Sequence, residues 1–144
     1  MNGPELSIII PAYNEAARIE GTLTSVREYL ERRELFYPVL VETGFKPIAK
    51  PAGAYYVMCD ISGFGFRTDT EFAHWLTESG SVATVPGSSF YRDPKRGYDK
   101  VRFAFCKKLD TLRAAAEKLR ALPPSPFGSR GRRDKDSPAA GKKK

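Results

Sequence analysis

The sequence has few of the residues that build metal centres, disulfide frameworks or membrane spans. Its 144 residues include one histidine and two cysteines without paired spacing, so no zinc site and no other metal site is predicted. No run approaches the ~18 consecutive apolar residues of a membrane helix. The N-terminus lacks a basic segment followed by a long apolar stretch, so no secretory signal is expected. We therefore expect a soluble, cytoplasmic protein.

The two cysteines, Cys59 and Cys106, each lie in an apolar run that is typical of a strand. Apolar surroundings and the absence of further cysteines indicate free, buried thiols in a reducing compartment rather than a disulfide. The hydrophobic share of 41% and the charged share of 28% are ordinary for a soluble globular domain. The length leaves room for one modest domain.

The net charge of +7 comes mainly from one end of the chain. Residues 123–144 hold seven Lys or Arg and two Asp, hence +5, which leaves +2 for the rest. This segment is rich in Pro, Gly and Ser and has one aromatic residue, so we expect a disordered basic tail. Weak, non-specific contact with nucleic acid is one expectation for it, although no interleaved aromatics are present to stack bases. A solubilising, solvated end is the plainer alternative.

Apolar periodicity predicts strands alternating with helices. The first helix is expected to follow Asn14, with Pro38 interrupting or restarting it and Gly44 ending a short piece beyond the proline. Together the elements indicate an α/β fold with a small mixed sheet and helices packed on it. The expected strands are 6–10, 45–49, 54–61, 82–85 and 100–106, and the later helices are 69–80 and 110–122.

Six pieces of the sequence occur in an order known from one enzyme family. They are ERREL, TGFKPIAKPAGAYYVMCDIS, EFAHWL, VATVPGSSFY and KVRFAFCKK, followed by a closing helix. Together, over residues 31–122, they resemble the C-terminal small domain of class I and II aminotransferases, which are fold-type I enzymes that use pyridoxal phosphate. The nearest subgroup acts on kynurenine, glutamine or methionine. Pro38 departs from the resemblance, because the family has uninterrupted helix there.

Arg102 is the residue to which this resemblance assigns a role. In the family, the arginine of the VRF strand binds the α-carboxylate of the substrate, which implies a substrate-binding role for Arg102. A guanidinium suits the task because its planar fork donates to both carboxylate oxygens. Strand alternation places Arg102 with the small residues Ala104 and Cys106, away from the apolar Val101 and Phe103. From periodicity alone, a solvated arginine at a strand edge or one paired with an aspartate is the alternative.

The neighbouring segments carry weaker expectations. The PGSSFY loop lines the mouth of the active site in the family, so the resemblance places Ser88 and Phe90 near it; a plain turn is the alternative. Tyr55 and Tyr56 are expected to be core or sheet-face aromatics rather than catalytic groups.

The cofactor chemistry of the family depends on residues that find no counterpart here. Its Schiff-base lysine, the Asp facing the pyridine nitrogen and the phosphate-holding residues belong to a large domain upstream. Lys46, Lys50, Lys100 and Lys107 match no cofactor motif. The resemblance therefore implies a truncated aminotransferase, without catalytic or cofactor-binding residues of its own. By itself it is expected to bind no pyridoxal phosphate, and it would take an amino-acid substrate only if a large domain is supplied.

The first 30 residues carry a different resemblance. LSIIIPAYNEAARIEGTLTSV is similar to the first strand, loop and helix of family 2 glycosyltransferases. The loop of that family touches the donor nucleoside, which implies contacts from Ala12, Tyr13 and Glu15. The metal-binding Asp-x-Asp of that family has one candidate, Asp134 and Asp136, in the basic tail, so sugar transfer is not expected. A simple strand–helix packed on the sheet is the alternative.

The sequence as a whole thus predicts a hybrid. Residues 1–30 form a glycosyltransferase-like strand–helix, residues 31–122 an aminotransferase small-domain-like body, and residues 123–144 a disordered tail. The predicted function is that of a truncated aminotransferase-like protein. Two alternatives stay open, a remnant glycosyltransferase and a non-catalytic interaction module that binds a protein partner or self-associates through an exposed former domain interface.

Overall fold

The computed structural model describes residues 16–127. None of the helices in this range is long and apolar enough to cross a membrane. The expected N-terminal strand, most of the basic tail and the residues assigned to a donor nucleoside lie outside the described residues. The elements are the helices α1 (Ala16–Glu42), α2 (Asp69–Gly80) and α3 (Leu109–Arg120), the strands β1 (Lys46–Pro47), β2 (Tyr56–Asp60), β3 (Val85–Pro86) and β4 (Lys100–Ala104), and the short 3₁₀ helices η1 (Ser62–Phe64), η2 (Gly87–Phe90) and η3 (Pro94–Gly97).

The four strands of the described sheet follow the order β1-β2-β4-β3, and every neighbouring pair is antiparallel. The expectation of a mixed sheet is therefore wrong for these residues. The alternation of helices and strands in the sequence predicts connections that cross over the sheet. The direction of each strand depends on where its connection re-enters the sheet. Here the chain passes through α2 to the edge strand β3, and β4 then returns between β3 and β2.

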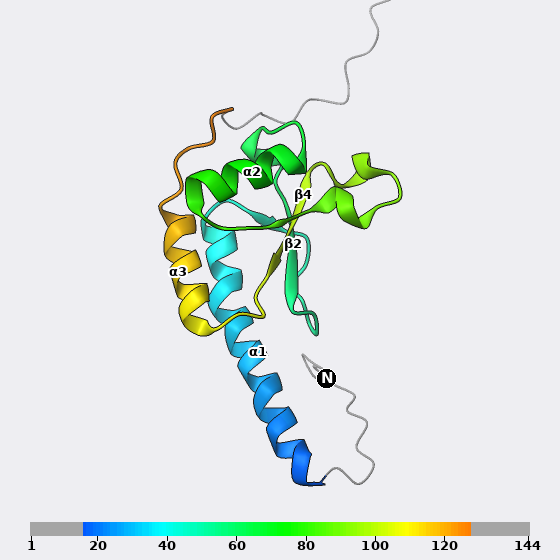
Figure 1. The fold of residues 1–144 in the computed structure, drawn as a ribbon, viewed down its shortest axis with the longest axis vertical. Helices are drawn as coiled ribbons and strands as arrows, with labels where there is room; N and C mark the ends of the chain where they lie inside the picture. Colours follow the sequence, from blue (N-terminus) through cyan, green and yellow to red (C-terminus); the bar gives the residue numbers. More distant parts are fainter. Residues whose placement is uncertain (1–15, 128–144) are drawn as a thin grey trace, which may run out of the picture.

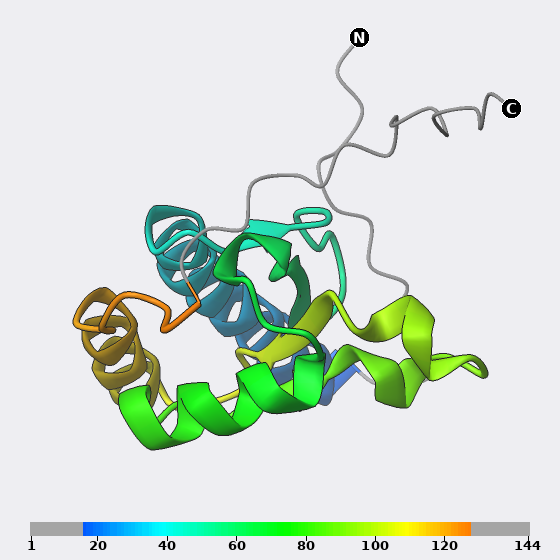
Figure 2. The ribbon, with the colours of Figure 1, turned by 90° about the horizontal axis from the view of Figure 1, so that it is seen from above.

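The sheet has one covered face and one open face. Along both β2 and β4, residues alternate between buried and half-buried, as a sheet packed on one side requires. The buried side chains of Val57, Cys59, Val101 and Phe103 belong to the covered face. Figures 1 and 2 show α1 and α3 side by side on one side of the strands, whereas the η2–η3 segment lies on the opposite side.

Aromatic side chains form the centre of the core. Phe45 is 2% exposed, and its ring centroid lies 4.9 Å from that of Phe64, 4.9 Å from that of Phe103 and 5.9 Å from that of Phe72. Edge-to-face and tilted arrangements at these distances are favourable beyond the burial of area alone. The cluster ties β4, α2 and η1 to the chain segment that leaves α1.

Helix α1 runs without a break through Pro38, which corrects the interruption expected there. A proline inside a helix removes one hydrogen bond and costs about 3 kcal/mol. The flanking Phe36, Val39 and Leu40 are all buried, and burying an apolar side chain contributes about 1.5–3 kcal/mol. Three such side chains outweigh the penalty, so tertiary packing keeps the helix continuous while Pro38 faces solvent.

Helix α2 begins and ends close to the predicted positions. The side chain of Thr68 accepts a hydrogen bond from the Glu71 N–H at 3.2 Å, and Asp69 and Glu71 place negative charge in the first turn. The helix ends at Gly80, and the capping residue that follows, Ser81, has a φ of 50° in the left-handed region. Helix α3 agrees with its expected range to within two residues at each end.

Two local expectations are corrected at the end of the fold. Cys59 is buried, as expected, but Cys106 is exposed because β4 ends at Ala104. The chain after α3 also keeps contact with the body, as the Ser125 hydroxyl donates to the Phe64 carbonyl. The Phe127 ring lies 4.9 Å from that of Phe66. Contacts with the body therefore extend at least five residues beyond Leu122.

Candidate functional site

Arg102 lies in the middle of the open face of the sheet. It pairs with Met58 of β2 on one side and with Val85 of β3 on the other, so β4 is an internal strand at this position. The predicted alternation is confirmed, because Val101 and Phe103 are buried on the covered face. The alternative of an arginine at a strand edge is therefore wrong.

The guanidinium of Arg102 is held between two aromatic rings. Its central carbon lies 4.6 Å from the ring centroid of Phe90 and 5.1 Å from that of Tyr56. Both distances are within the ~6 Å at which a cation is attracted to a ring face. Phe90 belongs to η2 and Tyr56 to β2, so two distant segments fix the direction of one cation.

The guanidinium of Arg102 has an unsatisfied hydrogen-bond donor among the described residues. Its Nε is buried and has no hydrogen-bond partner among the described residues. The salt bridges within residues 16–127 involve other arginines and lysines, so the alternative of a partner aspartate is not supported there. A buried donor without an acceptor is unfavourable, and a ligand oxygen would remove that cost.

A buried carboxylate fixes the loop that carries Phe90. Asp69 is fully buried, and its Oδ2 accepts a hydrogen bond from the Ser88 N–H at 2.6 Å. Its Oδ1 is buried without a hydrogen-bond partner among the described residues. As the first residue of α2, Asp69 also lies at the positive end of the helix dipole. No local pattern in the sequence shows that this carboxylate binds a backbone amide 19 positions away.

Two glycines allow η2 and η3 to touch through their backbones. A Cβ built on Gly97 would lie 2.3 Å from the Ser88 nitrogen, and one on Gly87 would lie 2.6 Å from the Lys100 carbonyl oxygen. No side chain fits at such distances. The close backbone contact and the Asp69 hydrogen bond together position η2, and with it Phe90, above Arg102.

The surroundings of the site are cationic. Residues 88–102 contain five Arg or Lys and two Asp, a net charge of +3. Lys100 is paired with Asp99, and its Nζ also lies 6.0 Å from the ring centroid of Tyr91. Arg96 stands over the same ring at 5.5 Å. A cationic surface interleaved with aromatic rings suits a small organic anion.

The other residues singled out in the sequence lie in different places. Ser88 donates its backbone N–H to Asp69. The ring of Tyr56 contacts the guanidinium of Arg102, and the neighbouring Tyr55 is 49% exposed. The rings of the two tyrosines lie 5.4 Å apart. Neither tyrosine is a core residue. Tyr56 lies on the open face of the sheet beside Arg102, as expected of a sheet-face aromatic, whereas Tyr55 precedes β2 and lies on the side of α1. Within residues 16–127, no cluster of three metal-ligating side chains occurs.

The described lysines do not fit the expected cofactor. Lys46 and Lys107 are exposed, and Lys50 is exposed and paired with Glu34. Lys100 is half-buried but donates to Asp99 and to the Arg96 carbonyl. A lysine that forms an imine with pyridoxal phosphate needs a desolvated pocket. None of these four lysines therefore has the surroundings that imine formation with pyridoxal phosphate requires.

Known proteins similar to this chain are aminotransferases. The methionine aminotransferase of Escherichia coli (strain K12) is 37% identical over 94 residues, which cover 65% of this chain and 24% of that protein. Kynurenine–oxoglutarate transaminase 3 of Rattus norvegicus is 32% identical over 105 residues, covering 65% and 23%. Aspartate aminotransferases match as well, so the finer subgroup assignment stays a prediction.

The fold gives the same result. A solved structure from Escherichia coli with a methionine aminotransferase function aligns with a TM-score of 0.66 at 35% identity, over 74% of this chain and 27% of that one. The chain thus spans about a quarter of the length of the relatives it matches.

The family model of aminotransferase class I and II matches residues 8–119. It includes most of the segment expected to derive from a glycosyltransferase, and no match supports such a fragment. A short strand followed by a capped helix is common to many α/β folds, so a resemblance of that length discriminates poorly. The chain belongs to the class I and II aminotransferases, a pyridoxal-phosphate-dependent family.

Proposed function

We propose that this chain provides the substrate-carboxylate site of an amino-transfer reaction, with Arg102 binding the α-carboxylate of an amino acid or a 2-oxo acid. The observation that carries the proposal is the state of the Arg102 side chain. It is oriented by Phe90 and Tyr56, its Nε is buried without an acceptor, and its charge has no carboxylate partner among the described residues.

A carboxylate ligand would complement each of these features of the Arg102 side chain. Its two oxygens match the planar fork of a guanidinium, and hydrogen bonds to charged groups contribute about 1.5–3 kcal/mol each. The aromatic rings limit side-chain motion before binding, so less rotamer entropy is lost when the ligand arrives. A single carboxylate is a small ligand, so the expected dissociation constant is on the order of millimolar.

The proposal assigns cofactor binding to residues other than those described. When bound, pyridoxal phosphate supplies the electron sink for amino transfer. The described part of the chain contributes binding and orientation of the acid group, with Asp69 and the Gly87–Gly97 contact positioning the loop above it.

The carboxylate site is tested by NMR titration of the purified chain with a 2-oxo acid and with the corresponding amide. We expect saturable shifts in β4 and η2 with the acid only. Arg102→Met should abolish them, and Arg102→Lys should weaken binding by about tenfold because an ammonium lacks the bidentate fork. Arg96→Met is the matched control, since Arg96 also stacks on a ring but lies exposed. Equal affinity in wild type and Arg102→Met would refute the assignment.

Amino transfer is tested in two steps. The chain alone, mixed with pyridoxal phosphate and treated with borohydride, should show incidental surface-lysine labelling but no stoichiometric imine. Adding the large domain of a relative such as the methionine aminotransferase should give transamination that depends on Arg102. Robust transamination by the chain alone would overturn the assignment of cofactor binding to other residues.

A non-catalytic interaction module is the alternative proposal, and possible self-association belongs with it. It would be favoured if Arg102→Met left carboxylate binding unchanged and no large domain restored activity. A remnant glycosyltransferase carries no proposal, because the family match already accounts for most of the segment on which it depended.

A further inference from the structure

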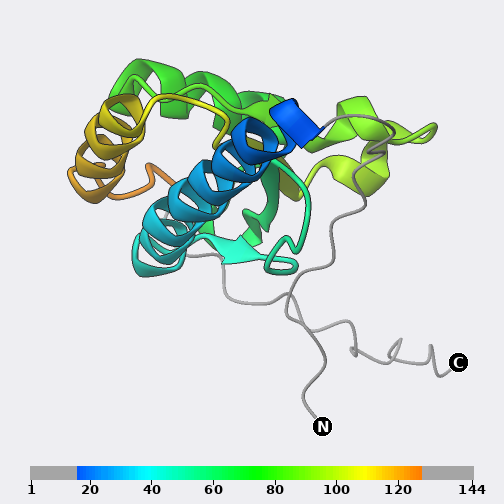
Figure 3. The ribbon, with the colours of Figure 1, turned by 90° about the horizontal axis from the view of Figure 1, so that it is seen from below.

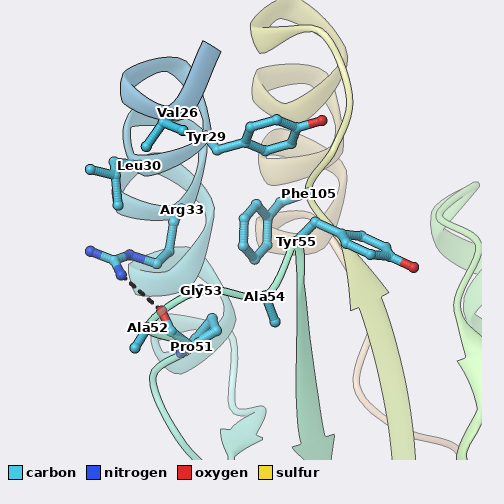
Figure 4. A pocket seen from close by; sticks show the side chains of 10 residues that line it. All are labelled: Val26, Tyr29, Leu30, Arg33, Pro51, Ala52, Gly53, Ala54, Tyr55 and Phe105. Atoms are coloured by element: carbon cyan, nitrogen blue, oxygen red, sulfur yellow. Dashed lines mark hydrogen bonds between the residues drawn. The ribbon is translucent and has the colours of Figure 1, made fainter. Parts of the chain in front are cut away.

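An apolar groove lies away from Arg102, between α1 and the loop that precedes β2. It has a volume of about 260 Å³. Figure 4 shows Val26, Tyr29 and Leu30 of α1 on one side and the segment from Pro51 to Tyr55 on the other, with Phe105 between them. The guanidinium of Arg33 donates to the Pro51 carbonyl at 2.8 Å and so fixes the loop against the helix.

The groove leaves apolar side chains of α1 in contact with solvent. Tyr29 is 42% exposed although it lies beside apolar neighbours, and Val26 and Leu30 are half-buried. Figure 1 shows the N-terminal half of α1 projecting beyond the strands, and Figure 3 shows the same helix from below, in front of the strands. The described residues leave this side of α1 without a covering element. Apolar surface of this kind is a site for a further segment or a partner.

We propose that the groove is occupied by Leu6–Ile10 of the same chain. The chain length permits it. Val26 lies ten residues into α1 from Ala16, which is about 15 Å along the helix axis. Ile10 is six residues before Ala16 and can reach about 20 Å in an extended conformation. The segment that continues from Ile10 towards Leu6 can then follow the groove from Val26 to Arg33.

The pattern of the segment matches this surface. In an extended strand, Leu6, Ile8 and Ile10 face one side and Ile9 faces the other. Four steps of about 3.3 Å span roughly 13 Å, close to the ~10 Å from Val26 to Arg33 along α1.

The matched variants are Ile8→Asp and Ile9→Asp in the full chain. They add the same charge at adjacent positions and differ in which face of the segment carries it. Hydrogen exchange should quicken by about tenfold or more in residues 26–33 and 51–55 of Ile8→Asp, because an apolar side chain is lost from the groove. The same amides in Ile9→Asp should stay within about twofold of wild type.

Three results would overturn the proposal. Equal acceleration in both variants would show that the segment has no preferred face, and no acceleration in either would show that it does not cover the groove. Protection that depends on protein concentration would assign the groove to a second copy or to another partner. Exchange in β4 and α3 serves as the internal reference, because both elements lie outside the groove-forming segments and report whether the body stays folded.

Discussion

Replacing Gly97 with alanine is the sharpest test of how the loop above Arg102 is held. The new Cβ would lie 2.3 Å from the Ser88 nitrogen and 2.4 Å from the Gly87 carbonyl carbon. Both contacts are to backbone, so no side chain can rotate away. Gly97 has no positive φ, so the strain would come from this contact and not from its own conformation.

The size of the effect follows from the distance. An ordinary contact starts at 3.4 Å, so η2 and η3 must separate by about 1.1 Å, the difference between 3.4 Å and 2.3 Å. Overpacking of this kind costs about 1–3 kcal/mol. The same shift weakens the hydrogen bond from Ser88 to Asp69, whose loss costs about 1–3 kcal/mol. We therefore expect a decrease of about 2–6 kcal/mol in the free energy of unfolding, the sum of the two ranges.

Urea unfolding followed by circular dichroism measures this change, with Gly63→Ala as the matched control. No heavy atom lies within 4 Å of a Cβ on Gly63, and its φ is not positive, so alanine there should change stability by less than about 1 kcal/mol. Gly97→Ala should also weaken carboxylate binding, because Phe90 moves with η2. If the two variants unfold at the same urea concentration, the backbone contact does not restrain the loop and the reasoning fails.

Three further outcomes follow from named contacts. Asp69→Asn should lower the free energy of unfolding by about 1–3 kcal/mol and alter the Ser88 amide shift; an unchanged shift would contradict the hydrogen bond. Burial raises the pKa of the Cys59 thiol to about 12, so at mildly alkaline pH a thiol reagent should label Cys106 alone until urea exposes Cys59. Hydrogen bonds from Lys50 and Arg33 lower the pKa of Glu34 in the folded protein below its ordinary value of 4.5. The ionised Glu34 carboxylate therefore stabilises the fold above pH 4.5, and this stabilisation is lost as the pH falls through the pKa of the folded state. The difference in urea midpoint between wild type and Glu34→Gln should therefore shrink below pH 4.5, and a constant difference would contradict it.

Much of the site was predictable where local pattern carries the information. Alternation in β4 placed Arg102 on the face opposite Phe103, and the structure confirms it. The ranges of α2 and α3 agreed to within two residues with those predicted from apolar periodicity. The role of Arg102 in substrate binding stays a prediction, since it depends on the family resemblance and on the titration described above.

Other features depended on contacts that no local pattern contains. The hydrogen bond from the Ser88 N–H to Asp69 joins a loop to the start of a helix 19 residues earlier. The uninterrupted α1 required the burial of Phe36 and Leu40 around Pro38. The low helix propensity of proline disfavours a continuous helix there, but the burial of the neighbouring side chains stabilises it.

The sequence by itself determined where α2, α3, β2 and β4 lie to within about two residues at most ends, which face of β4 carries the cation, and where the basic charge accumulates. Only the tertiary structure decided that the described strands are antiparallel, that Phe90 and Tyr56 enclose Arg102, and that a groove opens beside α1. Periodicity and capping act over a few residues of chain. Strand order and the meeting of distant side chains are fixed by where each crossover returns, and that is decided by the burial of apolar surface across the whole fold.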